Sequence, residues 1–258
     1  GLAALATRRW MRASAPVDDE TIAARFFTKL APALTGDGLA RTIITATNDL
    51  LDLPELTVLS MREALERRYL KEVAYTYCGD VVVSVNPFKN IGAVGPAIMT
   101  RYKSASGDWH ELPPHLYGLC SHAYAGVLSA TLEAPHQSVI ISGESGAGKT
   151  EAMKICLSYI VSVAARDGAS GPSIGEKLMN TNPVMEALGN AKTTRNNNSS
   201  RFGRYTLVRF NPDWTVAGAQ VRVFLLERSR VTSASNAKER SYHAFYQLIK
   251  AGGKYISP

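Results

Sequence analysis

A glycine-rich stretch at residues 143–150 has residue types and a spacing that suit phosphate binding. It consists of Gly143, Glu144, Ser145, Gly146, Ala147, Gly148, Lys149 and Thr150, which fits the pattern G-x-x-x-x-G-K-[ST]. Glycine lets the backbone adopt conformations that are closed to other residues, so several N–H groups can converge on a phosphate chain. In such a loop the lysine reaches the outer phosphates and the threonine offers its hydroxyl to Mg²⁺. The sequence therefore predicts a nucleoside triphosphate site.

The segments on either side of this loop are those that a phosphate-binding loop requires. Residues 138–142 have an apolar, β-branched centre, which predicts a buried strand. After the loop, apolar residues recur at helical spacing, and Gly168 is placed to stop the helix. The apolar positions are Met153, Cys156, Leu157, Ile160 and Ala164. The positive end of the helix dipole would then face the phosphates. The alternative interpretation is a glycine-rich turn that only joins a strand to a helix.

A second stretch, residues 191–203, is rich in amides and hydroxyls and carries several basic residues. It reads Ala-Lys-Thr-Thr-Arg-Asn-Asn-Asn-Ser-Ser-Arg-Phe-Gly. It lacks the hydrophobic period of a helix or a strand. It offers many donors to phosphate oxygens and a second hydroxyl to Mg²⁺. Taken alone, it could equally be a surface loop.

A third candidate is Asn86, which follows a β-branched run at residues 81–85 and precedes a proline. The run predicts an interior strand that ends at this Asn-Pro pair. The Asn86 amide could turn toward a nucleotide base, or the residue could be only a turn former. His110, His115 and His122 are spaced by five and seven residues, which does not suit two metal ligands on one helix face. We interpret these histidines as surface or packing residues.

Composition argues against several classes of protein. The chain has 258 residues, 45% of them hydrophobic, so it can bury a substantial core. No run approaches the roughly 18 apolar residues that indicate a membrane span. Cys78, Cys120 and Cys156 show no metal-ligand spacing, which predicts reduced cytosolic thiols. The formal net charge is +7, but the basic residues are spread along the chain, so we expect no nucleic-acid partner.

Hydrophobic periodicity predicts further helices and one hairpin. We expect helices at residues 55–71, 113–133, 174–190 with a new start near the proline at 183, and 238–250, and a hairpin at 205–226.

Together these stretches resemble the front part of a myosin motor domain. Residues 143–151 resemble that family's phosphate loop, and residues 182–203 resemble its first switch with the helix before it. Further resemblances lie, in the family's order, at residues 83–89, 113–117, 225–231 and 239–248. Kinesins share the Asn-x-x-Ser-Ser-Arg logic but have a different phosphate loop and different residues after the arginine.

The resemblance implies an α/β fold with a P-loop NTPase core of the myosin/kinesin type. In this core, helices flank a mixed, mostly parallel sheet, here truncated. We interpret residues 1–54 as an N-terminal extension to which the sequence assigns no role. We interpret residues 55–258 as a partial myosin-type motor domain that carries the phosphate loop and the first switch.

The resemblance also implies which residues bind ATP and Mg²⁺. Lys149 and the amides of residues 146–150 would hold the phosphates. Thr150 and Ser200 would bind Mg²⁺, and Asn196 would contact phosphate oxygens.

Other residues are implied in base recognition and hydrolysis. Asn86 would lie at the purine ring. Ser145 and Ser199 would lie near the γ-phosphate and the attacking water. Arg201 would pair with a glutamate of the family's second switch, and this pairing would close the site for hydrolysis.

The sequence departs from the family pattern in two places. Residues 90–95 offer no aromatic side chain, and the next one is Tyr102, so we expect weaker base selectivity than the family shows. The sequence also contains no Asp-x-x-Gly-Phe-Glu stretch, so we interpret it as an N-terminal piece that ends before the second switch. We then expect residues 138–142 or their neighbours to leave an unpaired apolar sheet edge, and the chain to bind Mg-ATP without efficient hydrolysis.

The resemblance implies an actin-based motor ATPase in the full-length protein, located in the cytoplasm with the cytoskeleton. Its partners would be F-actin, through regions mostly absent here, and light chains or calmodulin on the missing lever. An alternative is a non-motile protein that binds or scaffolds partners in response to nucleotide. A small-molecule P-loop kinase is a further alternative, but it leaves residues 196–203 unexplained.

Overall fold

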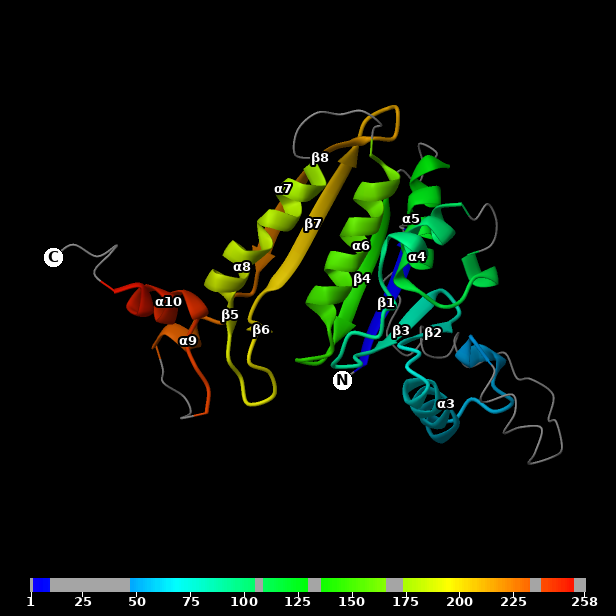
Figure 1. The fold of residues 1–258 in the computed structure, drawn as a ribbon, viewed down its shortest axis with the longest axis horizontal. Helices are drawn as coiled ribbons and strands as arrows, with labels where there is room; N and C mark the ends of the chain where they lie inside the picture. The colour runs from blue at the N-terminus through cyan, green and yellow to red at the C-terminus, as the bar shows by residue number, and fades with distance from the viewer. Residues whose placement is uncertain are drawn as a thin grey trace, which may run out of the picture. The chain divides into compact units, whose positions relative to one another are not determined.

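The computed structural model describes residues 2–9, 47–104, 109–129, 136–165, 174–232 and 238–252 (Figure 1). The chain forms two compact units, residues 1–160 and 161–258, and the division falls within helix α6 (Lys149–Val163). Most of the predicted N-terminal extension, and the predicted helix stop at Gly168, lie outside the described residues. Leu50 and Leu53 pack with Ala64 across the expected boundary after residue 54, and that boundary stays a prediction.

The first unit contains a four-stranded sheet in the order β2-β3-β1-β4. Its strands are β1 (Leu2–Arg9), β2 (Tyr75–Cys78), β3 (Val81–Val85) and β4 (Gln137–Gly143). β1 pairs antiparallel with β3 on one side and with β4 on the other. β2 and β3 are also antiparallel, since a tight turn joins them.

These pairings correct the expectation of a mostly parallel sheet. Every named strand pair among the described residues is antiparallel. The physical reason is that three of the pairs, β2–β3, β5–β6 and β7–β8, join strands that follow one another in the chain, whereas parallel neighbours need a crossover connection. The remaining pairs of the first unit involve β1, which runs against both of its neighbours.

The position of β1 also bears on the predicted unpaired edge. β4 is paired with β1 on one side, from Gln137 opposite Arg9 to Gly143 opposite Ala3. β4 is also the last strand in the order of this sheet, and Ile140 is 47% exposed. Within the described residues, β4 is therefore paired on one side only, and the unpaired edge stays a prediction.

The helices of the first unit begin at residues that favour helix starts. Besides α6, the described helices of this unit are α3 (Val58–Leu70), α4 (Pro96–Lys103) and α5 (Leu116–Leu128), with 3₁₀ turns η1 (Leu50–Asp52) and η2 (Trp109–Glu111). Thr57 and Ser60 form a capping box at α3, a proline opens α4, and His115 caps α5. α5 packs against β1 and β4. The ring of Tyr117 in α5 stacks on the ring of Tyr159 in α6, with the ring centroids 5.2 Å apart, and both residues are buried.

Beyond the end of α6, the described part of the second unit contains two antiparallel strand pairs and four helices. β5 (Asn190–Ala191) pairs with β6 (Ser199–Ser200), and β7 (Gly203–Phe210) pairs with β8 (Val216–Phe224). The helices are α7 (Ile174–Asn180), α8 (Asn182–Gly189), α9 (Ser229–Thr232) and α10 (His243–Ala251). The predicted new helix start is confirmed, because Pro183 lies in the first turn of α8. The predicted hairpin is also confirmed.

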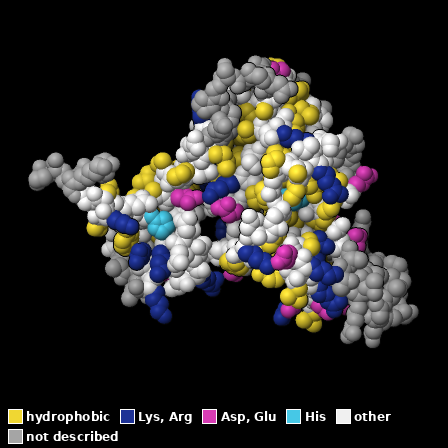
Figure 2. All heavy atoms as spheres, in the orientation of Figure 1, with side chains coloured by type: hydrophobic (Ala, Val, Ile, Leu, Met, Phe, Trp, Pro, Cys, Tyr) yellow, Lys and Arg dark blue, Asp and Glu magenta, His cyan; other side chains and the backbone are white. Residues whose placement is uncertain are grey.

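The described helices include none that is long and apolar enough to cross a membrane. The lysine and arginine side chains lie dispersed over the visible face of the molecule, and no continuous basic stripe is seen there (Figure 2). The absence of a nucleic-acid partner stays a prediction.

Candidate functional site

The phosphate loop, residues 143–150, joins β4 to α6 in the predicted order. Gly146 and Gly148 have φ angles of 83° and 92°, which glycine adopts readily and other residues rarely do. Ala147 is buried between them, and its N–H donates to the carbonyl oxygen of Glu144 at 3.1 Å. The first N–H groups of a helix have no acceptor within the helix. The loop therefore has the backbone conformation and the helix start that fit a phosphate group.

Lys149 lies over this loop. Its Nζ donates to the carbonyl oxygens of Gly143 at 2.6 Å and Glu144 at 2.8 Å. These carbonyls hold the ammonium beside the loop backbone, where phosphate oxygens can replace them as acceptors. Thr150 follows as the second residue of α6, and Ser145 is half-buried within the loop. The predicted phosphate-loop residues thus form the connection from the end of β4 to the first turn of α6.

Asn86 supports the phosphate loop. Its Nδ2 donates to the carbonyl oxygen of Gly146 at 2.8 Å, and its Oδ1 accepts from the backbone N–H of Phe88 at 2.9 Å. A role for Asn86 at the purine ring stays a prediction. Tyr102 is only 4% exposed and its hydroxyl donates to the carbonyl of Pro113 at 2.6 Å, so it is not placed to stack on a base.

The serine-rich loop, residues 191–203, belongs to the second unit and is folded by its own polar groups. The N–H of Thr193 donates to the carbonyl of Asn196 at 2.8 Å, and the N–H of Asn196 donates to the Thr193 hydroxyl at 3.0 Å. The Asn196 Oδ1 accepts from the N–H of Asn198 at 3.0 Å. The loop is therefore a defined turn.

The two serines of this loop form β6, which the sequence did not predict as a strand. Ser200 lies opposite Asn190 and Ser199 opposite Ala191. Ser199 is buried and Ser200 is half-buried. A two-residue pairing is too short to give a periodic pattern, which is why the sequence indicated only a loop.

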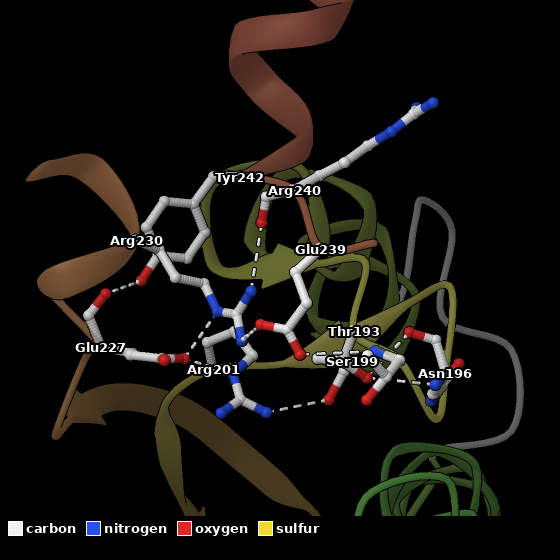
Figure 3. A network of polar contacts seen from close by, with 10 residues as sticks. Thr193, Asn196, Ser199, Arg201, Glu227, Arg230, Glu239, Arg240 and Tyr242 are labelled. Carbon is white, nitrogen blue, oxygen red and sulfur yellow. Dashed lines mark hydrogen bonds and ion pairs between the residues drawn. The ribbon is translucent and has the colours of Figure 1, made fainter. Parts of the chain in front are cut away.

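Arg201 has a carboxylate partner within the chain. Its Nε donates to Oε2 of Glu227 at 2.5 Å, and its Nη1 donates to the Ser199 hydroxyl at 3.2 Å (Figure 3). The backbone N–H of Glu227 donates to the carbonyl of Arg201 at 3.0 Å. The resemblance implies a second-switch glutamate as the partner of Arg201, but this sequence contains no Asp-x-x-Gly-Phe-Glu stretch. In this structure the Arg201 guanidinium is paired with Glu227 instead.

Sequence reasoning missed the charged network beyond Arg201. Arg230, whose side chain is 6% exposed, donates to Oε2 of Glu227 at 2.7 Å and to Oε2 of Glu239 at 3.1 Å (Figure 3). It also donates to the carbonyl of Arg240 at 3.1 Å. Both glutamates lie in stretches that resemble the family, at residues 225–231 and 239–248, and that resemblance was the only signal for them.

The charges in this network shift the pKa of Glu227 and the pKa of Arg230. Partial burial works to raise the pKa of Glu227, but hydrogen bonds and charges from Arg201 and Arg230 outweigh it and bring that pKa below its ordinary value. Burial works to lower the pKa of Arg230, but Glu227 and Glu239 raise it above its ordinary value. These groups therefore stay charged at neutral pH.

Comparison with known proteins agrees with these features. Residues 47–255 match the family described as the myosin head (motor domain). The chain belongs to the myosin head family. It is 40% identical over 212 residues to myosin IE heavy chain of Dictyostelium discoideum, a match that covers 82% of this chain and 20% of that protein.

Two further myosins are similar to this myosin head chain. Myosin heavy chain IB of Acanthamoeba castellanii is 43% identical over 203 residues, covering 78% of this chain and 17% of that protein. Unconventional myosin-Ia of Rattus norvegicus is 41% identical over 201 residues, covering 78% of this chain and 23% of that protein. The chain thus spans about a fifth of the length of these myosins. Membership of the myosin head family supports the expected P-loop NTPase class.

Proposed function

We propose that this chain is the ATP-binding front part of an actin-based motor ATPase. The observation that carries the proposal is the phosphate loop, in which Lys149 lies over two backbone carbonyls at the start of α6. Membership of the myosin head family supports ATP as the nucleotide and Mg²⁺ as its metal.

The proposed roles follow the resemblance residue by residue. Lys149 and the loop amides hold the phosphates, and Thr150 and Ser200 are the hydroxyl ligands of Mg²⁺. Asn196 contacts phosphate oxygens, and Ser199 lies near the γ-phosphate. Phosphoryl transfer depends on positioning and on charge stabilisation, which these groups and Mg²⁺ would supply.

Two residues have proposed roles that need contacts beyond those described. Asn86 already donates to the carbonyl of Gly146 and accepts from the N–H of Phe88, so a base would have to use its second amide hydrogen or its second carbonyl lone pair. Arg201 closes the site for hydrolysis only with a second-switch glutamate, which this sequence lacks. Residues 1–258 alone should therefore bind Mg-ATP without efficient hydrolysis. In the whole protein, F-actin and light chains or calmodulin are the proposed partners, and the cytoplasmic cytoskeleton is the proposed location.

A lysine substitution tests the phosphate site. ATP is titrated calorimetrically into wild type and into Lys149→Ala, with Lys154→Ala as a matched control, because Lys154 is on the same helix and pairs with Glu151 instead. Loss of a charge-assisted contact should weaken ATP binding by at least about tenfold in Lys149→Ala and should leave Lys154→Ala near wild type. Equal affinities of Lys149→Ala and wild type would refute the assignment.

A second candidate is a nucleotide-dependent binding protein without motility. The observation in its favour is that Arg201 is already engaged by Glu227 within this chain. Phosphate release by the whole protein, measured with and without filamentous actin, separates the two. Actin-stimulated release favours the motor, and ATP binding with no response to actin favours the non-motile protein.

A further inference from the structure

Glu227 holds one end of the serine-rich loop through its side chain and its backbone. Its Oε2 accepts from Nε of Arg201 at 2.5 Å, and its N–H donates to the Arg201 carbonyl at 3.0 Å. Its own carbonyl accepts from the hydroxyl of Tyr242 at 2.6 Å, and Tyr242 is buried. Three groups of Glu227, its carboxylate, its N–H and its carbonyl, are thus hydrogen-bonded, and two of these bonds hold Arg201 (Figure 3).

The other end of the loop is held by the segment that follows Glu227. The backbone N–H of Arg240 donates to the carbonyl of Lys192 at 3.1 Å, and the N–H of Thr194 donates to Oε1 of Glu239 at 3.4 Å. Arg230 joins the two ends, because it donates to Glu227 and to Glu239. One charged network therefore contacts the serine-rich loop near both of its ends.

Arg201 depends on the Glu227 carboxylate more than Arg230 does. Without its carboxylate, Arg230 still has Glu239 and the carbonyl of Arg240 as acceptors. Arg201 would keep only the Ser199 hydroxyl among the side-chain acceptors seen here. Loss of the Glu227 charge should therefore release Arg201 and Ser199 without removing the support of the buried Arg230.

We propose that Glu227 is a positioning residue for nucleotide binding, which holds Arg201 and, through it, Ser199 of the serine-rich loop in the arrangement that Mg-ATP requires. The inference rests on the proposed function, which gives the serines of this loop their roles at Mg²⁺ and the γ-phosphate. It predicts that Glu227 affects the Mg²⁺-dependent part of ATP affinity and leaves the part due to the phosphate loop unchanged.

The test compares ATP dissociation constants in Mg²⁺ and in EDTA. Wild type should bind more tightly in Mg²⁺, and Glu227→Gln should lose about tenfold of that gain while its affinity in EDTA stays the same. Glu227→Asp, which keeps the charge, should recover part of the gain. Asp213→Asn, in the β7–β8 turn, is the matched control for charge removal and should behave as wild type. A general weakening of folding would lower both affinities, and an unchanged Mg²⁺ gain in Glu227→Gln would overturn the proposal.

Hydrogen exchange of the serine-rich loop gives a readout that needs no nucleotide. Amides of residues 190–203 should exchange about tenfold faster in Glu227→Gln than in wild type, with Asp213→Asn unchanged. If Glu227→Gln does not fold, Tyr242→Phe is used, which removes only the hydroxyl on the Glu227 carbonyl and should also speed exchange of this loop. Unchanged exchange in the folded variant would overturn the proposal even if ATP does not bind. Failure of wild type to bind ATP, with the expected exchange, would instead refute the proposed function alone.

Discussion

The pH dependence of the first unit should be governed by His115. This residue caps α5, and its ring is buried beside Tyr75, Tyr102 and Tyr117. Its Nδ1 accepts from the N–H of Tyr117 at 2.9 Å, and its Nε2 donates to the carbonyl of Ala93 at 2.8 Å. The cap therefore needs the neutral ring, because a proton on Nδ1 would remove the acceptor.

Burial lowers the pKa of His115 to about 4, although the hydrogen bond to Ala93 acts in the opposite direction. In the unfolded chain a histidine has a pKa of about 6.5, so acid protonates the unfolded state first. The stabilisation that neutral His115 gives the fold is fully present above the pKa of the unfolded chain. It is lost as the pH falls toward the lower pKa of His115 in the folded chain. Linkage gives a loss of about 2 kcal/mol between about pH 7.5 and about pH 5.

Urea unfolding of wild type and His115→Asn at these two pH values measures this effect. Asparagine can still cap the helix but does not titrate in this range. Wild type should lose about 2 kcal/mol more stability than His115→Asn on acidification. Equal losses in the two proteins would refute the reasoning, because some other group would then carry the pH dependence.

Three further predictions concern Gly189 at the end of α8, Asn86, and the choice between ATP and GTP. Gly189→Ala should destabilise the second unit by about 1–3 kcal/mol in urea unfolding, because an added Cβ would lie 2.2 Å from the Phe202 ring; unchanged stability would contradict the close approach. Asn86→Ala should weaken ATP binding about fivefold in calorimetry, since Gly146 loses its donor; an unchanged affinity would show that the loop needs no such support. GTP should compete with ATP for the site more effectively than is usual for myosins, because residues 90–95 offer no aromatic side chain to stack on the base; a strong preference for ATP in competition against a fluorescent nucleotide would show that another aromatic fills that place.

The local elements near the phosphate loop could be predicted from sequence because their signals are local. The apolar run before the loop and the helical spacing after it predict a strand and a helix, which are found as β4 and α6, but β4 is half-buried to exposed and not the buried strand that its apolar residues predicted. The break before Pro183 is a covalent property of proline and is equally local. Helix ends were less accurate: the predicted helix over 113–133 is found as Leu116–Leu128, since terminal turns depend on particular caps.

Features that depend on long-range pairing could not be predicted in this way. Residues 2–9 pair with β3 and β4, far along the chain, and nothing in their own pattern indicates those partners. The partner of Arg201 is another case, because Glu227 lies 26 residues away and is one of many carboxylates in the sequence. The contact from Asn86 to the backbone carbonyl of Gly146, 60 residues further along the chain, could not be predicted from sequence either, and the role of Asn86 at a base stays a prediction.

The central claim, recognition of a triphosphate by the loop at residues 143–150, is tested most directly by titrating wild type with ATP, ADP and AMP in Mg²⁺. Each further phosphate adds charged oxygens that Lys149 and the loop amides can bind. The account predicts one ATP bound per chain, with affinity falling from ATP to ADP and steeply to AMP. Equal affinity for ATP and AMP, or no binding of ATP by the folded chain, would contradict it.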